Sequence, residues 1–155
     1  RGTGVIVRLI EYMDVGNINH WRETDTVPSA ELRARIQQRW PLREERSNYD
    51  GEVATRYMYE DGAGEIGFIS SVTEPFCGSC HRARLSSDGR LFTCLFASAG
   101  TDLRQPMRVG ASDALLADII HKAWVRRTDR YSEQRARLIE DGREMRKMEM
   151  YYIGG

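Results

Sequence analysis

The chain has 155 residues, enough for one domain with a buried core, and its charge is balanced at 23 basic against 23 acidic residues. Such a balance argues against bulk binding of nucleic acid or of membranes. No apolar run approaches the ~20 residues that a membrane helix needs, and no signal peptide is visible. An odd number of cysteines, three in all, argues against a secreted disulfide framework, so we expect a reducing, cytoplasmic compartment.

The chain lacks an initiator methionine and begins with a strand-like run, Val5 to Met13, so we expect it to be a portion of a longer protein. The run is nearly continuous in β-branched and aliphatic residues, which is typical of a strand buried on both faces in a parallel sheet. Arg8 and Glu11 interrupt it. Charged residues in such a strand indicate either a lined cavity or a buried ion pair.

A polar loop and one helix follow this strand. Residues 14–26 contain several loop-forming residues and are expected to be irregular. Ser29 is expected to cap a helix that runs to about Trp40, where Pro41 stops it. Residues 42–48 are so rich in charge that we expect a solvated connection there.

The middle of the chain is expected to form a pair of hairpins, and helices are expected toward the C-terminus. Glycine-containing turns separate the hairpin strands. These strands are expected at residues 51–59, 65–71, 82–86 and 90–96. Ser112 is expected to cap a helix to Trp124, because apolar residues recur there at helical spacing. A shorter helix is expected from near Ser132 to before Gly142.

The most informative feature of the sequence is the C-x2-C-x13-C spacing of its three cysteines, Cys77, Cys80 and Cys94. Three thiolates can hold a metal centre and leave one coordination position open. One interpretation is a structural Cys3His zinc site, completed by a histidine at position 20, 81 or 121. The other is an iron–sulfur cluster with three cysteine ligands and one free iron. The spacing does not distinguish between these two kinds of site.

The turn Ser87-Asp88-Gly89 decides which residues of the second hairpin face each other. With the glycine in a G1 bulge, Cys94 lies opposite Arg82, and Arg84 shares that face of the hairpin. A plain two-residue turn would instead pair Cys94 with Ala83 and send both arginines to the other face. We favour the bulged register, because it places guanidinium groups beside the thiolates, where anionic oxygens can bind.

The cysteines stand in a longer motif, Phe76-Cys77-Gly78-Ser79-Cys80-His81-Arg82-Ala83-Arg84-Leu85, continued by Ser86-Ser87-Asp88-Gly89-Arg90 and Cys94-Leu95-Phe96. Three further segments accompany it in order, namely residues 8–17, residues 64–69 and the terminal Tyr152-Ile153-Gly154-Gly155. Together they resemble the GTP 3′,8-cyclases of molybdenum cofactor biosynthesis, which are radical S-adenosylmethionine enzymes. The likeness runs nearly end to end and indicates the C-terminal portion of such an enzyme, since the family's N-terminal C-x3-C-x2-C motif is absent here.

The resemblance implies a role for each of these segments. The implied ligands of the second 4Fe–4S cluster, whose open iron meets the guanine end of GTP, are Cys77, Cys80 and Cys94. The implied GTP-binding residues are Arg82, Ala83 and Arg84. An S-adenosylmethionine contact is implied at Met13. By the same resemblance, Gly154 and Gly155 form a tail that reaches into the active site and belongs to the catalytic residues.

The resemblance also implies a fold and partners. We expect an α/β chain, with residues 1–50 as the last strand and helix of an incomplete (β/α) radical S-adenosylmethionine barrel. Residues 51–155 would form a small β-rich domain with packing helices that binds the cluster and GTP. The full-length enzyme, a lyase, would convert GTP to (8S)-3′,8-cyclo-7,8-dihydroguanosine 5′-triphosphate with S-adenosylmethionine and a second 4Fe–4S cluster. This chain alone is expected to be inactive, and its candidate protein partners are the missing N-terminal portion and a second copy.

Two other functions fit some of these features. A zinc-binding interaction module could use the same cysteines, although the balanced charge and the lack of an aromatic-studded basic patch count against contacts with nucleic acid. Another radical S-adenosylmethionine enzyme with an auxiliary cluster would act on a different substrate. The Arg82-Ala83-Arg84 segment and the terminal Gly-Gly favour the GTP enzyme.

Overall fold

The computed structural model describes residues 1–142 and 146–153. The chain is α/β and divides into two compact units. Unit 1 comprises Arg1–Met13 and Trp21–Cys80, and unit 2 comprises Asp14–His20 and the chain from His81 onward. The expected division at residue 50, between barrel and cluster domain, stays a prediction. Within the described residues, no helix has the length and apolar character that crossing a membrane requires.

Unit 1 is built on a four-stranded mixed sheet with the order β1-β4-β3-β2. The strands are β1 (Val7–Ile10), β2 (Leu42–Glu45), β3 (Thr55–Tyr59) and β4 (Glu65–Ile69). β1 runs parallel to β4, whereas β2, β3 and β4 are antiparallel neighbours. The predicted parallel pairing of the first strand and the predicted hairpin of β3 and β4 are therefore confirmed.

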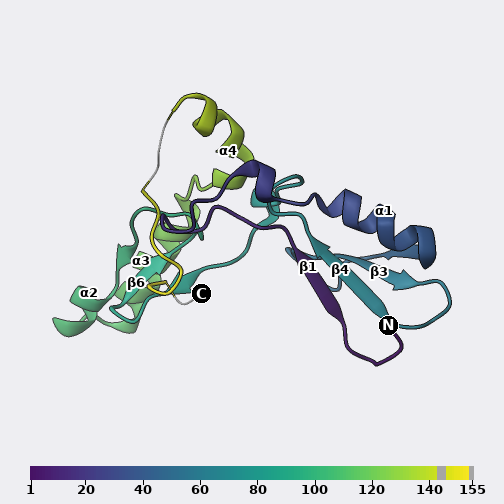
Figure 1. Ribbon diagram of the computed structural model, residues 1–155. Coiled ribbons are helices and arrows are strands. Elements are labelled where there is room, and N and C mark those ends of the chain that lie inside the picture. The colour runs from purple at the N-terminus through teal and green to yellow at the C-terminus, as the bar shows by residue number, and fades with distance from the viewer. Residues whose placement is uncertain (143–145, 154–155) are drawn as a thin grey trace. The chain divides into compact units, whose positions relative to one another are not determined.

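Helix α1 (Ser29–Arg39) covers one face of this sheet (Figure 1). The buried core of the unit consists of sheet residues, and two side chains of the helix, Leu32 and Ile36, pack against it. The core residues are Leu42, Tyr57, Ile66 and Phe68. Burial of this apolar face is what fixes the helix on the sheet, because a helix of this length is only marginally stable alone in water.

The first strand is not buried on both faces, so that prediction is wrong for the described residues. Val7 and Ile10 are 49% and 58% exposed. The reason is topological, since β1 lies at the edge of the sheet and, among the described residues, pairs with β4 alone. A continuous apolar run reports residue type alone and does not reveal whether a second strand covers the outer edge.

Two further predictions in unit 1 are wrong. Ser29 does not cap α1, because Pro28 holds the N-cap position and Ser29 is the first helical residue. Residues 42–48 are not merely a connection, because β2 forms there and pairs with β3. Leu42 supplies the one buried side chain of β2, opposite Tyr59, and its charged neighbours obscure the strand in the sequence.

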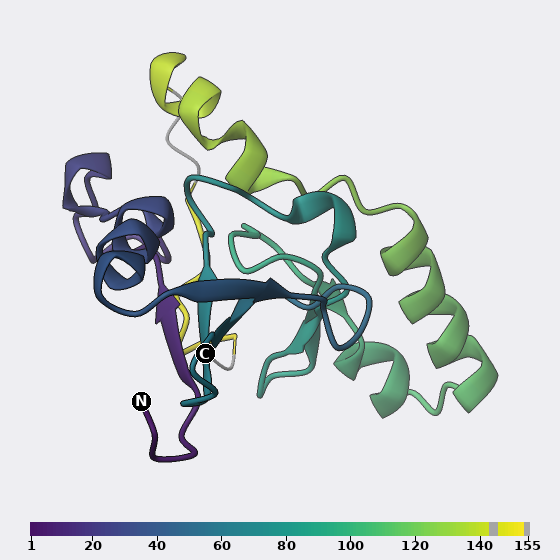
Figure 2. The ribbon, with the colours of Figure 1, turned by 90° about the vertical axis from the view of Figure 1, so that its right-hand side faces the viewer.

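In its described residues, unit 2 combines a three-stranded antiparallel sheet with three helices, which are coloured green to yellow-green in Figure 2. The strands are β5 (Arg84–Leu85), β6 (Arg90–Phe92) and β7 (Thr101–Asp102), and the helices are α2 (Arg104–Arg108), α3 (Asp113–Val125) and α4 (Tyr131–Glu140). The predicted hairpin and both predicted helices are confirmed. The Ser112 hydroxyl caps α3 as predicted, accepting a hydrogen bond from the Leu115 N–H at 3.3 Å. The short elements β7 and α2 were not predicted.

Candidate functional site

The C-x2-C pair belongs to unit 1 and spans a single helical turn. Cys77 begins the short 3-10 helix η2 (Cys77–Ser79), and the Cys80 N–H donates to the Cys77 carbonyl at 3.3 Å. Side chains three residues apart in such a turn lie on the same side. Both cysteines are reduced thiols and partly exposed. This local geometry suits two ligands of one metal centre.

The third cysteine, Cys94, belongs to unit 2 and follows β6. Its sulfur accepts a hydrogen bond from the Phe96 N–H at 3.4 Å, and its carbonyl accepts one from the Ala97 N–H at 3.3 Å. Cys94 is also a reduced thiol and partly exposed. N–H donation to sulfur favours a thiolate and is one of the interactions that tune iron–sulfur centres.

The hairpin that carries the arginines has the bulged register. Arg84 pairs with Phe92, and the Ser86 N–H donates to the Arg90 carbonyl at 2.9 Å. Gly89 has a φ of +82°, the left-handed conformation that the bulge requires. The prediction of a G1 bulge is confirmed, and the two-residue alternative is wrong. The ladder ends at Arg84 and Phe92, so Arg82 and Cys94 lie beyond its hydrogen-bonded stretch.

The predicted site residues are divided between the two units. Met13 and the first two cysteines belong to unit 1, and Cys94 and residues 82–84 belong to unit 2. Gly154 and Gly155 lie outside the described residues. Within the described stretches of the chain, no three His, Cys, Asp or Glu side chains form a ready-made metal group. The joint ligand set therefore stays a prediction from the sequence.

A buried carboxylate, Glu11, organises the region of unit 1 that leads to the cysteine pair. Only 3% of the residue is exposed. One oxygen accepts the Ser29 N–H at 2.7 Å and the Thr73 hydroxyl at 2.6 Å, and the other accepts the N–H groups of Val72 and Thr73. Burial raises the pKa of Glu11, but these hydrogen bonds outweigh it and hold the pKa below its usual value. We call these four residues the Glu11 centre.

A second buried carboxylate, Asp14, is the corresponding feature of unit 2. Its oxygens accept hydrogen bonds from the Tyr131 hydroxyl at 2.5 Å, Arg135 Nε at 2.8 Å and Lys147 Nζ at 2.6 Å. Burial raises the pKa of Asp14, but the bonds from Lys147 and Tyr131 and the two cations bring the pKa below its usual value. We call these four residues the Asp14 centre.

Arg8, which lies in β1, forms an ion pair. Its Nη2 lies 2.7 Å from Glu65 Oε1, and Arg56 binds the same carboxylate at 2.5 Å. The bond from Arg56 is the largest cause that lowers the pKa of Glu65. Arg8 also packs over Gly67, where any added Cβ would come within 2.7 Å of the arginine side chain. Arg8 therefore takes part in an ion pair, although 29% of its side chain is exposed, whereas Glu11 binds hydrogen-bond donors that carry no charge.

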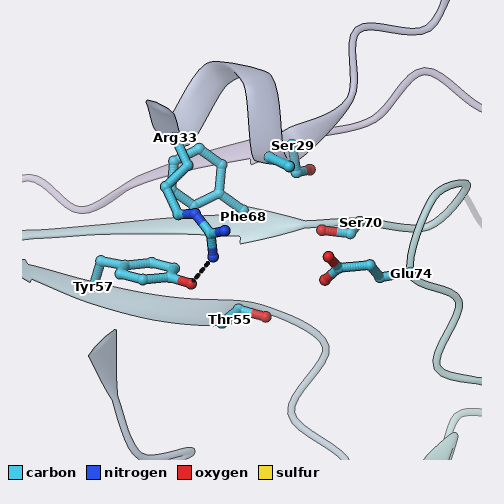
Figure 3. Close-up of a pocket in the computed structure, with 8 residues that line it drawn as sticks. Ser29, Arg33, Thr55, Tyr57, Phe68, Ser70 and Glu74 are labelled. Atoms are coloured by element: carbon cyan, nitrogen blue, oxygen red, sulfur yellow. Dashed lines mark hydrogen bonds between the residues drawn. The ribbon is translucent and has the colours of Figure 1, made fainter. Parts of the chain in front are cut away.

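Unit 1 also has two hollows that could act as binding sites. Figure 3 shows the smaller one, beside the start of α1, where Arg33 Nη1 donates to the Tyr57 hydroxyl at 2.5 Å. Its volume of about 20 Å³ holds about one water molecule. The larger, of about 360 Å³, has a mostly charged and polar lining. Among the described residues that line either hollow, none is a predicted site residue.

Sequence reasoning missed both carboxylate centres as structural units. Tyr131 and Arg135 stand one helical turn apart, which places them on one face of a helix. Nothing local connects them with Asp14, because 117 and 121 residues separate each of them from it. The sequence offers one indication, namely acidic residues within and just after the apolar run of residues 5–13. Glu11 interrupts that run, whereas Asp14 belongs to the polar loop that follows it.

Comparison with known proteins identifies the family. The family model for Molybdenum Cofactor Synthesis C matches residues 5–133. A GTP 3′,8-cyclase from Xanthomonas campestris pv. campestris (strain B100) is 52% identical over all of this chain and 44% of its own length, at its C-terminal end. Cyclases of the same name from Acidothermus cellulolyticus and Synechococcus sp. (strain CC9605) are 48% and 47% identical, with 49% and 43% of their lengths covered.

The chain thus spans less than half the length of these curated relatives, and it aligns with their C-terminal portion. The resemblance drawn from the cysteine motif and its companion segments is confirmed. The chain belongs to the Molybdenum Cofactor Synthesis C family.

Proposed function

We propose that this chain is the C-terminal portion of a GTP 3′,8-cyclase, a radical S-adenosylmethionine lyase of molybdopterin precursor synthesis. The full-length enzyme would convert GTP to (8S)-3′,8-cyclo-7,8-dihydroguanosine 5′-triphosphate, and this portion would hold the second 4Fe–4S cluster and GTP. The observation that carries the proposal is the identity of 52%, over the whole chain, with proteins of that name. The three reduced cysteines stand within the matching segment.

The cysteines are suited to the proposed cluster. Thiolates are the ligands that iron–sulfur centres use, and all three cysteines are partly exposed and take part in no disulfide. The tight turn of Cys77 and Cys80 and the N–H donation to Cys94 are local features that support metal ligation. When bound, such a cluster would supply an open iron that acts as a Lewis acid toward the purine of GTP.

The arginines that follow the cysteine pair would bind and orient GTP. Arg82 and Ala83 are exposed, and Arg84 is partly buried at the start of β5. Guanidinium groups bind phosphate oxygens in bidentate fashion, which fixes both distance and orientation. Holding the ribose carbon close to the purine ring would be the main contribution of this portion of the enzyme, because positioning alone can lower the barrier substantially.

The exposed edge of unit 1 supports the proposal that the sheet continues in the full-length protein. In the part of the chain that the structure describes, β1 pairs in parallel with β4 and has no strand on its other side, and its apolar side chains Val7 and Ile10 are exposed. An open apolar edge is a template for a further strand. We propose that it joins the radical S-adenosylmethionine barrel, which would place Met13 beside S-adenosylmethionine and leave this chain inactive alone. The tail glycines Gly154 and Gly155 are proposed as catalytic on the family resemblance.

The cluster can be tested by anaerobic reconstitution of the chain with iron and sulfide. We expect Cys→Ser at any of the three positions to abolish iron and sulfide retention, because the hydroxyl is a poor ligand for iron. Ser79→Ala, in the same exposed turn, is the matched control and should retain both. Full retention in the cysteine variants would contradict the proposed ligand set.

GTP binding is tested by titrating the reconstituted chain while following the absorption spectrum of the cluster. Arg84→Gln keeps the length and polarity of the side chain but removes its charge, so the GTP-dependent change should weaken about tenfold or more. Arg43→Gln is the control, since Arg43 forms an exposed ion pair with Glu45. A response that S-adenosylmethionine, peptides and GTP all produce equally would favour a different radical enzyme. Stoichiometric zinc without a GTP response would favour a zinc-binding module.

A further inference from the structure

The Asp14 centre is almost completely buried and combines charges of both signs. Asp14 is 6% exposed and Arg135 is 3% exposed. Lys147 is also nearly buried, with 11% of its side chain exposed, and its ammonium group binds both the carboxylate and the main-chain carbonyl of Asp14. A buried cation that loses its partner is strongly destabilising, so the carboxylate holds both cations in place.

The Asp14 centre is connected to Cys94 through an aromatic stack. Tyr131, which donates to Asp14, stacks on Phe96 with 4.6 Å between ring centroids and 26° between planes. The Arg135 guanidinium lies 5.3 Å from the centre of the Phe96 ring. Phe96 in turn donates its N–H to the Cys94 sulfur. One chain of contacts therefore leads from the buried carboxylate to the sulfur of the third cysteine.

The same centre is connected to residues 146–153, which we call the tail segment. Asn17, three residues after Asp14, exchanges two hydrogen bonds with the main chain of Lys147, at 2.6 and 3.0 Å. The Met148 N–H donates to the Ala97 carbonyl at 3.0 Å. The tail segment is thus bonded both to residues beside Asp14 and to the loop that carries Cys94.

The remote end of the tail segment is packed as well. Tyr152 donates to Asp88 at 2.5 Å, and its ring meets Phe92 edge to face. Ile153 is fully buried. The tail segment therefore has a defined position through Ile153, and the Asp14 centre is its anchor at the other end.

We propose that Asp14, with Tyr131, Arg135 and Lys147, is a positioning centre that holds residues 93–97, the Cys94 loop, in the geometry required of a metal ligand. The same centre sets the path of the tail segment. Asp14 is assigned no contact with substrate or metal, so it is a positioning residue. That the loop serves to bind a metal rests on the proposed function. The coupling between Asp14 and the Cys94 loop does not depend on a metal.

The coupling is tested by hydrogen exchange on the metal-free chain, comparing Asp14→Asn with the unaltered protein. We expect the amides of Phe96, Ala97 and Met148 to exchange at least about tenfold faster in the variant, because the local structure that protects them opens more often. Amides of Ile66 and Phe68 in unit 1 should be unchanged. A general loss of stability would accelerate exchange at all of these amides, in both units. That result would overturn the proposal, and so would unchanged exchange at Phe96, Ala97 and Met148.

Two further variants keep the test decisive. Asp118→Asn makes the same chemical change in an exposed ion pair with Lys122 and should leave exchange unaltered. If Asp14→Asn does not fold, Tyr131→Phe removes one donor while keeping the ring stack and both charge pairs. Tyr131→Phe should accelerate exchange at the same amides by a smaller factor. Exchange that is faster at all amides, or at none, in this variant would overturn the proposal.

A second readout joins the inference to the cluster and separates it from the proposed function. After reconstitution, Asp14→Asn should retain several-fold less iron than Asp118→Asn and show an altered cluster absorption spectrum. An unaltered spectrum with full iron would overturn the role of the centre in ligand positioning. If the unaltered chain takes up no iron, the proposed function fails, and the exchange pattern alone then decides whether Asp14 positions the Cys94 loop.

Discussion

Two buried carboxylates, Glu11 and Asp14, stand three residues apart on either side of Met13, yet they belong to different units and are stabilised by different donors. Among the described residues, the hydrogen-bond donors to Glu11 are all neutral, namely three backbone N–H groups and one hydroxyl. Asp14 accepts hydrogen bonds from a phenol and from two cations.

The difference shows two ways of burying a negative charge next to a predicted ligand-binding segment. In the Glu11 centre the carboxylate gathers main-chain donors, one of which is at the start of α1, where the helix favours a negative charge. In the Asp14 centre the carboxylate offsets the positive charge of two buried side chains, Arg135 and Lys147. Removing Asp14 takes the carboxylate away from two buried cations, whereas removing Glu11 takes the acceptor away from three backbone amides. We therefore expect the Asp14 centre to be the less tolerant of the two.

The largest effect is expected for Asp14→Ala. It removes the carboxylate that the buried Lys147 ammonium binds and that Arg135 also contacts, which should lower the free energy of unfolding by about 3–5 kcal/mol. Urea denaturation measures this loss. Asp118→Ala, in an exposed pair, should cost at most about 1 kcal/mol. An equal loss in the two variants would contradict the contrast drawn between the centres.

A smaller effect is expected for Glu11→Gln. The amide keeps the shape of the side chain but replaces one acceptor oxygen with an NH2 group that faces N–H donors. Each buried N–H group that loses its acceptor destabilises the folded state by about 1–3 kcal/mol, so the free energy of unfolding should fall by about that amount. A loss as large as that of Asp14→Ala, in the same urea experiment, would show that the kind of donor does not matter.

Acid should destabilise the protein through both centres. The pKa values of Glu11 and Asp14 lie below their usual values in the folded chain, and unfolded Glu and Asp titrate at about 4.3 and 3.9. Their stabilising contribution is therefore present above about pH 4 and is lost as the pH falls through the lower, folded pKa values. Unfolding free energies measured from pH 6 to pH 2 should fall less steeply in Glu11→Gln and Asp14→Asn. Unchanged slopes would contradict the assignment of these carboxylates.

The smallest effect concerns a residue outside both centres. Ser112→Ala removes the N-cap hydrogen bond of α3 and should lower the free energy of unfolding by about 1 kcal/mol. Ser112→Asp, which keeps a capping oxygen, should retain most of the stability. A larger loss than in Glu11→Gln would mean that local capping outweighs the buried carboxylate.

Elements with a strong local pattern could be predicted from the sequence. The Ser112 cap and the apolar spacing of α3 both act within one or two turns, and the Ser-Asp-Gly turn determines the hairpin register through the backbone of Gly89. The cysteine motif and its companion segments were sufficient to identify the family, because they recur in a fixed order.

Elements that depend on distant contacts could not be predicted. The predicted cap of α1 was wrong because Ser29 is already the first helical residue, and its N–H is bonded to Glu11, which lies just after β1. β2 was missed because a single buried leucine among charges gives no alternating pattern. The Asp14 centre joins residues more than 115 positions apart, and no local spacing records such a contact.

The most direct test of the proposed cluster is anaerobic reconstitution of the chain with iron and sulfide, with an iron count and an absorption spectrum recorded with and without GTP. We predict about four irons per chain and a spectral change that depends on GTP. Stoichiometric zinc, no uptake of iron and no response to GTP would contradict this prediction and would make the three cysteines a structural zinc site.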